Sequence, residues 1–148
     1  MSQQIDPAAL VAAIGDALIV SDVAGRVVVW NAAAERLFGW TEAEALGQRM
    51  DMIIPERLRK RHWEGYDKSM QTGETRYAHD VLRVPAVDKA GRSMSIAFTV
   101  FMLFGADGKP NACGSVIRDE TERFTRDREL RSRLAELEAK VAAGSAGA

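Results

Sequence analysis

The apolar and polar positions of the chain change period several times, and each change predicts an element of structure. Five segments show the short apolar or alternating pattern that is typical of β-strands, at residues 17–21, 26–30, 77–87, 94–103 and 112–118. Turn-forming residues separate the first two segments at Asp22–Gly25. We therefore expect these two strands to form a hairpin.

Between the second and third strands the apolar period lengthens to that of helices. Asn31 and Thr41 precede two short helical segments, and both are suitable N-cap residues. A longer helix is expected over residues 56–71, where one face is formed at four-residue intervals by Leu58, His62, Tyr66 and Met70. A lead-in helix is predicted near the start of the chain, where Asp6 and Pro7 are typical of a helix N-terminus.

Strands thus cluster at both ends of the folded region, with helices inserted between them. This order favours an α+β domain built on one antiparallel sheet with helices on one face. We expect a lead-in helix within residues 1–15, the sheet domain over residues 16–121, a C-terminal helix over residues 122–143 and a disordered tail over residues 144–148.

The C-terminal helix has a pattern of its own. From Glu120 to Ala143 the chain lacks glycine and proline and is densely charged. Large aliphatic residues follow one another at spacings of four, three and four, at Leu130, Leu134, Leu137 and Val141. This spacing covers about two heptads and predicts a short coiled coil. We therefore expect a homodimer that is joined through this helix.

Composition narrows the class of protein. The chain has 148 residues, of which 47% are hydrophobic, and this suits one globular domain. With 20 basic and 21 acidic side chains the net charge is −1, so we expect neither nucleic acid nor a membrane as a partner. The single cysteine, Cys113, cannot form an intramolecular disulfide, and the N-terminal residues lack the pattern of a secretory signal. These features predict a cytoplasmic protein.

Two motifs resemble the signature of a known family. The segment Val29–Trp40 is similar to the strand-to-helix signature of PAS domains, and Glu42–Gly47 continues it. Near the other end, Gly114–Thr121 is similar to the last PAS strand and to the family's Asp-x-Thr exit motif. The resemblance covers residues 14–121 and implies a five-stranded antiparallel sheet that cups a helical face. It also implies a role in sensing and dimeric signal relay.

Three residues of these motifs are candidates for signal relay, namely Asn31, Asp119 and Thr121. Asp119 is able to cap the C-terminal helix, with its carboxylate at the positive end of the helix dipole, and Thr121 can hydrogen-bond nearby backbone. Simple capping without a signalling role is the alternative interpretation. For Asn31 we favour that structural role.

The segment around His62 carries a narrower resemblance. Residues 53–62 are similar to the segment that supplies the axial histidine in the haem-PAS domains of rhizobial oxygen-sensor kinases. A neutral imidazole on a rigid helix facing an apolar pocket can bind haem iron from one side and leave the other side for a diatomic gas. The resemblance implies that His62 binds haem iron. The alternative is a core histidine that is hydrogen-bonded to backbone.

The expected pocket takes its other residues from the same helix and from two strands, namely Leu58, Trp63, Tyr66, Met70, Leu82, Ile96, Phe98 and Val100. In the haem subgroup an arginine downstream of the histidine stabilises bound gas, whereas the ungapped position here is Leu82, next to Arg83. A phenylalanine at position 98 is able to fill part of the space that a porphyrin needs.

Other cofactors fit less well than haem. Covalent flavin photochemistry of the LOV type needs a cysteine in the helical region, whereas Cys113 lies in a terminal strand. The alternatives to haem are therefore a non-covalent flavin or a small organic ligand.

The sequence offers no sign of an enzyme, because it shows no nucleophile with a paired base and no phosphate-binding glycine loop. We expect a sensory module that binds a small ligand and passes the change to a partner through a dimeric C-terminal helix. No kinase, cyclase or helix-turn-helix effector fits after Thr121, so the output is expected on another chain or in a larger protein. The alternative is a ligand-free module that dimerises or docks partners through its exposed sheet face and lead-in helix.

Overall fold

Five strands pair in the order β2-β1-β5-β4-β3, and every pairing is antiparallel. This computed structural model describes residues 3–146. The strands are β1 (Ala17–Asp22), β2 (Val27–Trp30), β3 (Leu82–Val87), β4 (Ser93–Phe104) and β5 (Pro110–Asp119). The predicted α+β fold with one antiparallel sheet is confirmed, and the sheet has the five strands that the resemblance implied.

The register of the strands fixes which side chains face the helices. Directly opposed residues of neighbouring strands carry their side chains on the same face of a sheet. On the inner face the opposed pairs include Ile19–Trp30, Ala17–Ile117, Phe98–Ile117 and Val84–Ile96. The alternating pattern of the strands therefore sends one apolar row from each strand toward the same layer.

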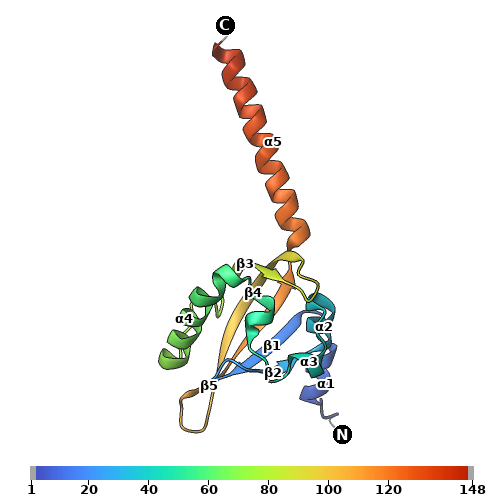
Figure 1. Ribbon diagram of the computed structural model, residues 1–148, viewed down its shortest axis with the longest axis vertical. Coiled ribbons are helices and arrows are strands. Elements are labelled where there is room, and N and C mark those ends of the chain that lie inside the picture. The colour runs from blue at the N-terminus through green and yellow to red at the C-terminus, as the bar shows by residue number, and fades with distance from the viewer. Residues whose placement is uncertain (1–2, 147–148) are drawn as a thin grey trace.

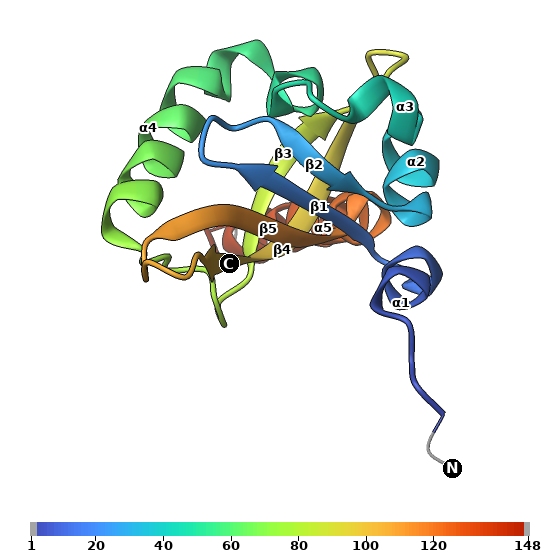
Figure 2. The ribbon, with the colours of Figure 1, turned by 90° about the horizontal axis from the view of Figure 1, so that it is seen from below.

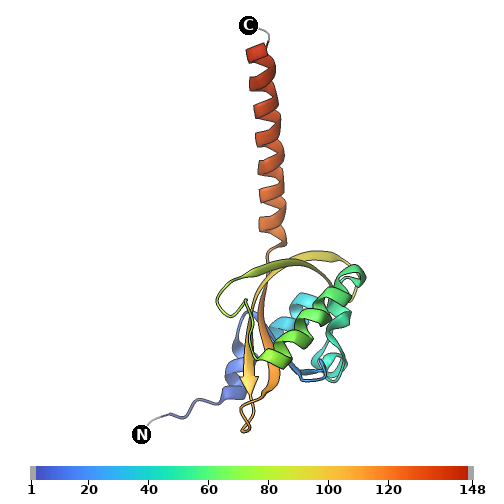
Figure 3. The ribbon, with the colours of Figure 1, turned by 90° about the vertical axis from the view of Figure 1, so that its left-hand side faces the viewer.

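Helices cover that inner face between β2 and β3. They are α2 (Ala32–Phe38), α3 (Glu42–Ala45), the 3-10 turn η1 (Met50–Ile53) and α4 (Glu56–Thr72), and the lead-in helix is α1 (Pro7–Ala13). Figure 3 shows α2, α3, η1 and α4 on one side of the curved sheet. The predicted caps are confirmed, since the side chains of Asp6, Asn31 and Thr41 accept hydrogen bonds from the first turns of α1, α2 and α3.

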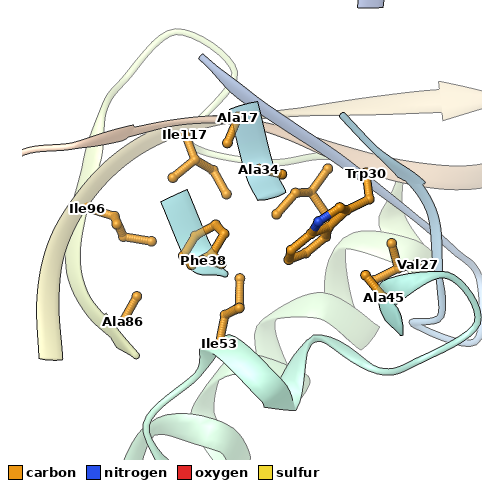
Figure 4. Close-up of a cluster of buried hydrophobic side chains, with 11 residues drawn as sticks. Ala17, Val27, Trp30, Ala34, Phe38, Ala45, Ile53, Ala86, Ile96 and Ile117 are labelled. Atoms are coloured by element: carbon orange, nitrogen blue, oxygen red, sulfur yellow. The ribbon is translucent and has the colours of Figure 1, made fainter. Parts of the chain in front are cut away.

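The core is concentrated under α2, α3 and η1. Trp30 and Phe38 are almost completely buried, with ring centroids 5.7 Å apart, and Ile53 of η1 closes over them. Figure 4 shows the side chains of this cluster converging from the sheet and from the helices. The cluster reaches across the sheet through Ile96 and Ile117.

One predicted strand is shorter than expected. The segment at residues 77–87 was predicted to be extended throughout, but β3 begins at Leu82, and residues 76–79 form a turn. Tyr77 still touches the sheet, because its carbonyl accepts a hydrogen bond of 2.8 Å from Val100 N. Residues 78–81, which follow it, are all exposed, so no apolar row holds them against the core.

The C-terminal helix α5 (Thr121–Ala146) projects from the sheet as a rod, at the end of the domain opposite α1 (Figure 1). It continues past the expected end at residue 143, so the predicted disordered tail of residues 144–148 begins too early; residues 147 and 148 lie outside the described residues. Its aliphatic seam is more than half exposed at Leu130, Leu134, Leu137 and Val141. Within residues 3–146 no helix is both long and apolar enough to span a membrane.

Candidate functional site

Helix α4 forms a wall beside the sheet rather than a tightly packed lid. It spans 17 residues, starts after Pro55 and ends at Gly73, which takes the left-handed conformation with a φ of 73°. None of its residues is fully buried in the described structure. The predicted inner stripe is half-buried at Leu58, His62, Tyr66 and Met70. Figure 2 shows α4 running past the β1–β2 turn, on the side away from α2 and α3.

Trp63 fastens α4 to the β1–β2 turn. A Cβ atom placed on Gly25 would lie 2.4 Å from Cζ3 of Trp63, so the indole ring needs a residue without a side chain beneath it. The indole Nε1 donates a hydrogen bond of 2.6 Å to Oδ1 of Asp51. The guanidinium carbon of Arg49 lies 4.0 Å from the centroid of the Trp63 ring. Trp63 therefore links α4 to both the β1–β2 turn and η1.

Tyr66 makes a second attachment one turn further along α4. Its hydroxyl donates a hydrogen bond to the backbone carbonyl of Asp22. Burial raises the pKa of Tyr66 above its ordinary value of 10.0, so the hydroxyl stays protonated and keeps this bond. Together Trp63 and Tyr66 tie the middle of α4 to the hairpin.

His62 lies beside these attachments and has no comparable bond. Its Nδ1 is buried and has no hydrogen-bond partner among residues 3–146. The imidazole instead packs edge-on against Trp63, with centroids 4.7 Å apart, and lies 6.1 Å from the Tyr66 ring. Within residues 3–146, Nδ1 of His62 therefore lacks the backbone hydrogen bond that the alternative interpretation expected.

Burial decides the charge of His62. Desolvation lowers the pKa of the imidazole below its ordinary value of 6.5, and the nearby carboxylate of Asp51 opposes this change only in part. The side chain is therefore neutral at pH 7. A neutral imidazole is the form that binds metal ions and accepts hydrogen bonds.

Part of the inner face of β3 and β4 is less covered than the rest of the core, because Leu82, Phe98 and Val100 are each half-buried there. Ile96 differs, because only 4% of its surface is exposed and it belongs to the closed cluster with Phe38. The structure thus brings most of the predicted pocket residues to one side of the sheet and assigns Ile96 to the packed core.

Two hollows of the surface lie elsewhere. One of 520 Å³ lies at the end of β2, beside α3 and η1, and one of 300 Å³ lies between β1, α2 and the end of β5. Neither is lined by a residue of α4. The first hollow contains Arg26 and Arg49. Neither was a candidate from the sequence, because an arginine that lines a binding site has no local sequence pattern that separates it from other surface arginines.

The fold and these motifs agree with one family. The family model for the PAS fold matches residues 11–124, which is most of the chain. This chain belongs to the PAS family. PAS domains are sensory modules, so the family supports the predicted sensory class.

The curated relatives that this PAS domain matches are much longer proteins, and the chain spans about a quarter of their length or less. The chain is 32% identical over 131 residues to the sensor protein FixL of Bradyrhizobium diazoefficiens, a match that covers 86% of this chain and 24% of FixL. It is 35% identical over 116 residues to an uncharacterized protein of Azorhizobium caulinodans, covering 78% of this chain and 16% of that protein. The likeness to FixL supports the predicted resemblance to rhizobial oxygen sensors.

Solved structures show the same fold. The PAS domain of a protein from Colwellia psychrerythraea superposes with a TM-score of 0.66 at 21% identity, covering 78% of this chain and 94% of that one. An RNA-binding light-oxygen-voltage receptor gives a TM-score of 0.70 at 21% identity, covering 91% of this chain and 40% of the receptor. At these identities the likeness concerns the fold alone.

The relay candidate Asn31 is a buried junction of this PAS domain. Its Oδ1 accepts hydrogen bonds from Leu18 N at 2.9 Å and from Ala34 N at 3.0 Å. Its Nδ2 donates to the carbonyls of Val11 and Asp16, each at 3.1 Å. One side chain therefore joins α2 to β1 and to the end of α1, which is a larger structural role than the predicted cap.

Asp119 and Thr121 form the junction between the sheet and α5. Oδ1 of Asp119 accepts from Thr121 N at 2.8 Å and from the Thr121 hydroxyl at 2.5 Å. The same hydroxyl oxygen accepts a hydrogen bond of 3.0 Å from Ser95 N, and Ser95 O accepts one of 2.8 Å from Glu120 N. The start of α5 is therefore tied to β4 as well as to β5, a contact that no local pattern predicts.

Cys113 stands on the inner face of β5, opposite Ser21. Burial raises the pKa of its thiol to about 11. The thiol is therefore protonated at neutral pH and is a poor nucleophile. Cys113 therefore acts as a small packing residue of the sheet rather than as a reactive thiol.

Proposed function

We propose that this PAS domain senses a small ligand held between α4 and the inner face of the sheet. The observation that carries the proposal is the buried, unpartnered Nδ1 of the neutral His62. A buried polar atom without a partner is costly, so a native structure retains one mostly where a ligand or function uses it. The half-buried side chains around it supply apolar walls that a ligand can complete.

Haem is the ligand class that we place first. His62 would hold the iron, because its ring makes no hydrogen bond within residues 3–146 that would compete for a lone pair. Leu58, Met70, Leu82, Phe98 and Val100 would line the porphyrin. A bound haem iron supplies a coordination position for a diatomic gas. Since α4 contributes no fully buried residue, a shift of α4 away from the sheet would make room at little cost in packing.

A non-covalent flavin or a small organic ligand is the second ligand class. The proteins that the chain resembles include a sensor protein and a light-oxygen-voltage receptor, so this fold serves more than one kind of sensor. Such a ligand would use His62 as a hydrogen-bonding group rather than as a metal ligand.

An absorbance scan of the purified protein with and without added haem tests the proposal. We expect a sharp Soret band that is lost in His62→Ala. His79→Ala is the matched control, because it removes the other histidine, which is exposed in the turn after α4, and it should retain the band. A band that survives in His62→Ala, or no band after reconstitution, would remove haem sensing from the proposal.

The signal would leave through the junction of Asp119, Thr121 and Ser95. A displacement of β4 by a ligand would move the start of α5, because the two are joined by hydrogen bonds at both Glu120 and Thr121. The effector would be carried by a partner protein or by a further domain. Thr121→Val keeps the shape of the residue but removes the hydroxyl, so we expect ligand binding to persist while the ligand-dependent change in α5, read by a spin label or fluorophore on α5, is reduced.

Dimerisation through α5 is the partner arrangement that we propose. The exposed aliphatic seam from Leu130 to Val141 gives α5 a surface that a second copy can bury. Light scattering on the full chain and on a chain truncated after Thr121 tests this. We expect the full chain to be a dimer and the truncated chain to be a monomer. A truncated chain that remains dimeric would assign the subunit contact to another surface.

A ligand-free interaction module is the alternative function. It is favoured by exposed apolar residues away from α4, on the outer sheet face at Leu103 and Val116 and on α1 at Leu10. If the chain binds no haem, flavin or organic ligand but the truncated chain stays dimeric, this alternative replaces the sensing proposal.

A further inference from the structure

The hollow of 520 Å³ at the end of β2 has features of a binding site that is separate from the space under α4. It lies where α3 packs beside β2, as Figure 1 shows, and its volume falls within the range of small-molecule sites. Its lining includes Arg26, Trp40, Glu44, Arg49, Asp51 and Met52. Charged groups of both signs are thus combined with an aromatic ring and a thioether.

Two arginines line this hollow from paired positions of the backbone. Arg26 and Arg49 are opposed in an isolated antiparallel bridge, so their side chains leave the backbone on the same side. The bridge is held by hydrogen bonds on both sides of Val27, from its N to the carbonyl of Gln48 at 2.9 Å and from Gly47 N to its carbonyl at 2.8 Å. Like charges directly opposed in this way destabilise a fold unless a counter-charge is present.

The protein does not supply that counter-charge. Within residues 3–146 neither Arg26 nor Arg49 has a carboxylate within ion-pair distance. Arg26 donates to the carbonyl of Gly47 at 2.9 Å, and Arg49 lies over the Trp63 ring. Each guanidinium group therefore has N–H donors that are not paired with a carboxylate of the described residues.

The two carboxylates that line the hollow are engaged elsewhere. Glu44 lies 2.6 Å from Lys89 Nζ, and this bond, with those from Thr41, lowers the pKa of Glu44 to about 2. Asp51 accepts the hydrogen bond of Trp63 Nε1. The carboxylate of Glu44 is therefore negative at pH 7 and would repel an anion from its own side of the hollow, so an anion would be placed between the arginines.

We propose that this hollow binds a small oxyanion, a carboxylate or phosphate group, between Arg26 and Arg49. Arginine forks bind such groups through paired, charge-assisted hydrogen bonds. Trp40 and Met52 offer an apolar wall for the rest of the molecule, and the buried indole Nε1 of Trp40 has no acceptor in the described chain. Because Arg49 also rests on Trp63, occupancy of the hollow is coupled to α4 and thus to the space beside His62.

Isothermal titration calorimetry with inorganic phosphate and with succinate, each against sodium chloride at equal ionic strength, tests the proposal on the full chain. We expect saturable binding of at least one oxyanion, weakened about tenfold or more in Arg26→Gln and in Arg49→Gln. Arg57→Gln is the matched control, because it removes the same charge from an exposed position of α4 outside the hollow, and it should bind like the wild type.

The titrations with phosphate and with succinate distinguish the two classes of ligand. Binding of phosphate indicates a phosphorylated ligand, and binding of succinate indicates an organic acid. Binding of neither, or equal weakening in Arg57→Gln, would overturn the site. Circular dichroism of the two glutamine variants checks the fold, and we expect their melting temperatures without oxyanion to be no lower than that of Arg57→Gln, because a repulsion has been removed. In His62→Ala the oxyanion should still bind, so failure of the sensing proposal and failure of this site are distinguishable.

Discussion

The two halves of the helical layer differ in how they meet the sheet. Under α2, α3 and η1 the core is closed, with Trp30, Phe38 and Ile53 exposing 3% of their surface or less. Under α4 every residue of the inner stripe is only half-buried, and the sheet residues opposite are half-buried too. One half therefore contains the closely packed core of the domain, and the other half is held to the sheet more loosely.

The sequence of α4 explains its incomplete burial. Residues spaced four apart advance by about 40° around a helix, so a stripe from Leu58 to Met70 turns by about 120° and cannot face a sheet along its whole length. Most of the other positions are charged. In α2, by contrast, Ala33, Ala34 and Phe38 bring a small and closely packed surface against β1. Helix α4 is instead fixed at discrete points by Trp63 and Tyr66.

The largest expected difference between the halves concerns large-to-small substitutions. Phe38→Ala should lower the free energy of unfolding by about 3–5 kcal/mol, because it leaves a cavity in a closed core. Met70→Ala should lower it by about 1–2 kcal/mol, because the side chain is already half-exposed. Urea denaturation measures both changes. Equal costs would show that the layer under α4 is packed as tightly as the other half.

The second prediction concerns the attachment of α4 through Trp63. Gly25→Ala and Gly47→Ala both place a side chain at a positive φ, of 81° and 82°, but only the first meets the Trp63 ring, since nothing lies within 4 Å at Gly47. We expect Gly25→Ala to cost about 1–3 kcal/mol more than Gly47→Ala, because the ring must move from its hydrogen bond with Asp51. Chemical denaturation and tryptophan fluorescence measure the two effects. Identical unfolding curves would mean that Trp63 does not fasten α4.

The smallest predicted effect is a pH dependence that arises from His62. The pKa of His62 is lower in the folded state than its ordinary value of 6.5, so below pH 6.5 the unfolded chain binds more protons than the folded one. Stability should therefore fall as the pH drops from 7 toward 5. His62→Gln should flatten this part of the profile, whereas His79→Gln should not. Melting temperatures across this pH range provide the measurement, and parallel profiles for wild type and His62→Gln would contradict the burial argument.

Local chemistry was enough to predict much of the fold and part of the candidate site. The caps at Asp6, Asn31 and Thr41 follow from side chains that satisfy backbone donors within a few residues, so the sequence alone indicates them. The apolar stripe of α4 follows instead from the four-residue spacing of Leu58, His62, Tyr66 and Met70. The sequence did not indicate the turn at residues 76–79, because Tyr77 and Val81 have side chains that are typical of strands. The start of β3 is set by its pairing with β4, which is a tertiary contact.

The alternation of apolar residues and the placing of turns thus determined which segments are strands and helices, because these preferences act between near neighbours. Tertiary structure alone decided that Gly25 lies beneath Trp63, that Ser95 holds the start of α5 and that Arg26 opposes Arg49. These contacts join residues that are far apart in the chain, and their free energy depends on the register and packing of the whole sheet. The stripe of α4 limits how far that helix can be buried, but which part of the sheet is closed and which is loosely covered was decided by that packing.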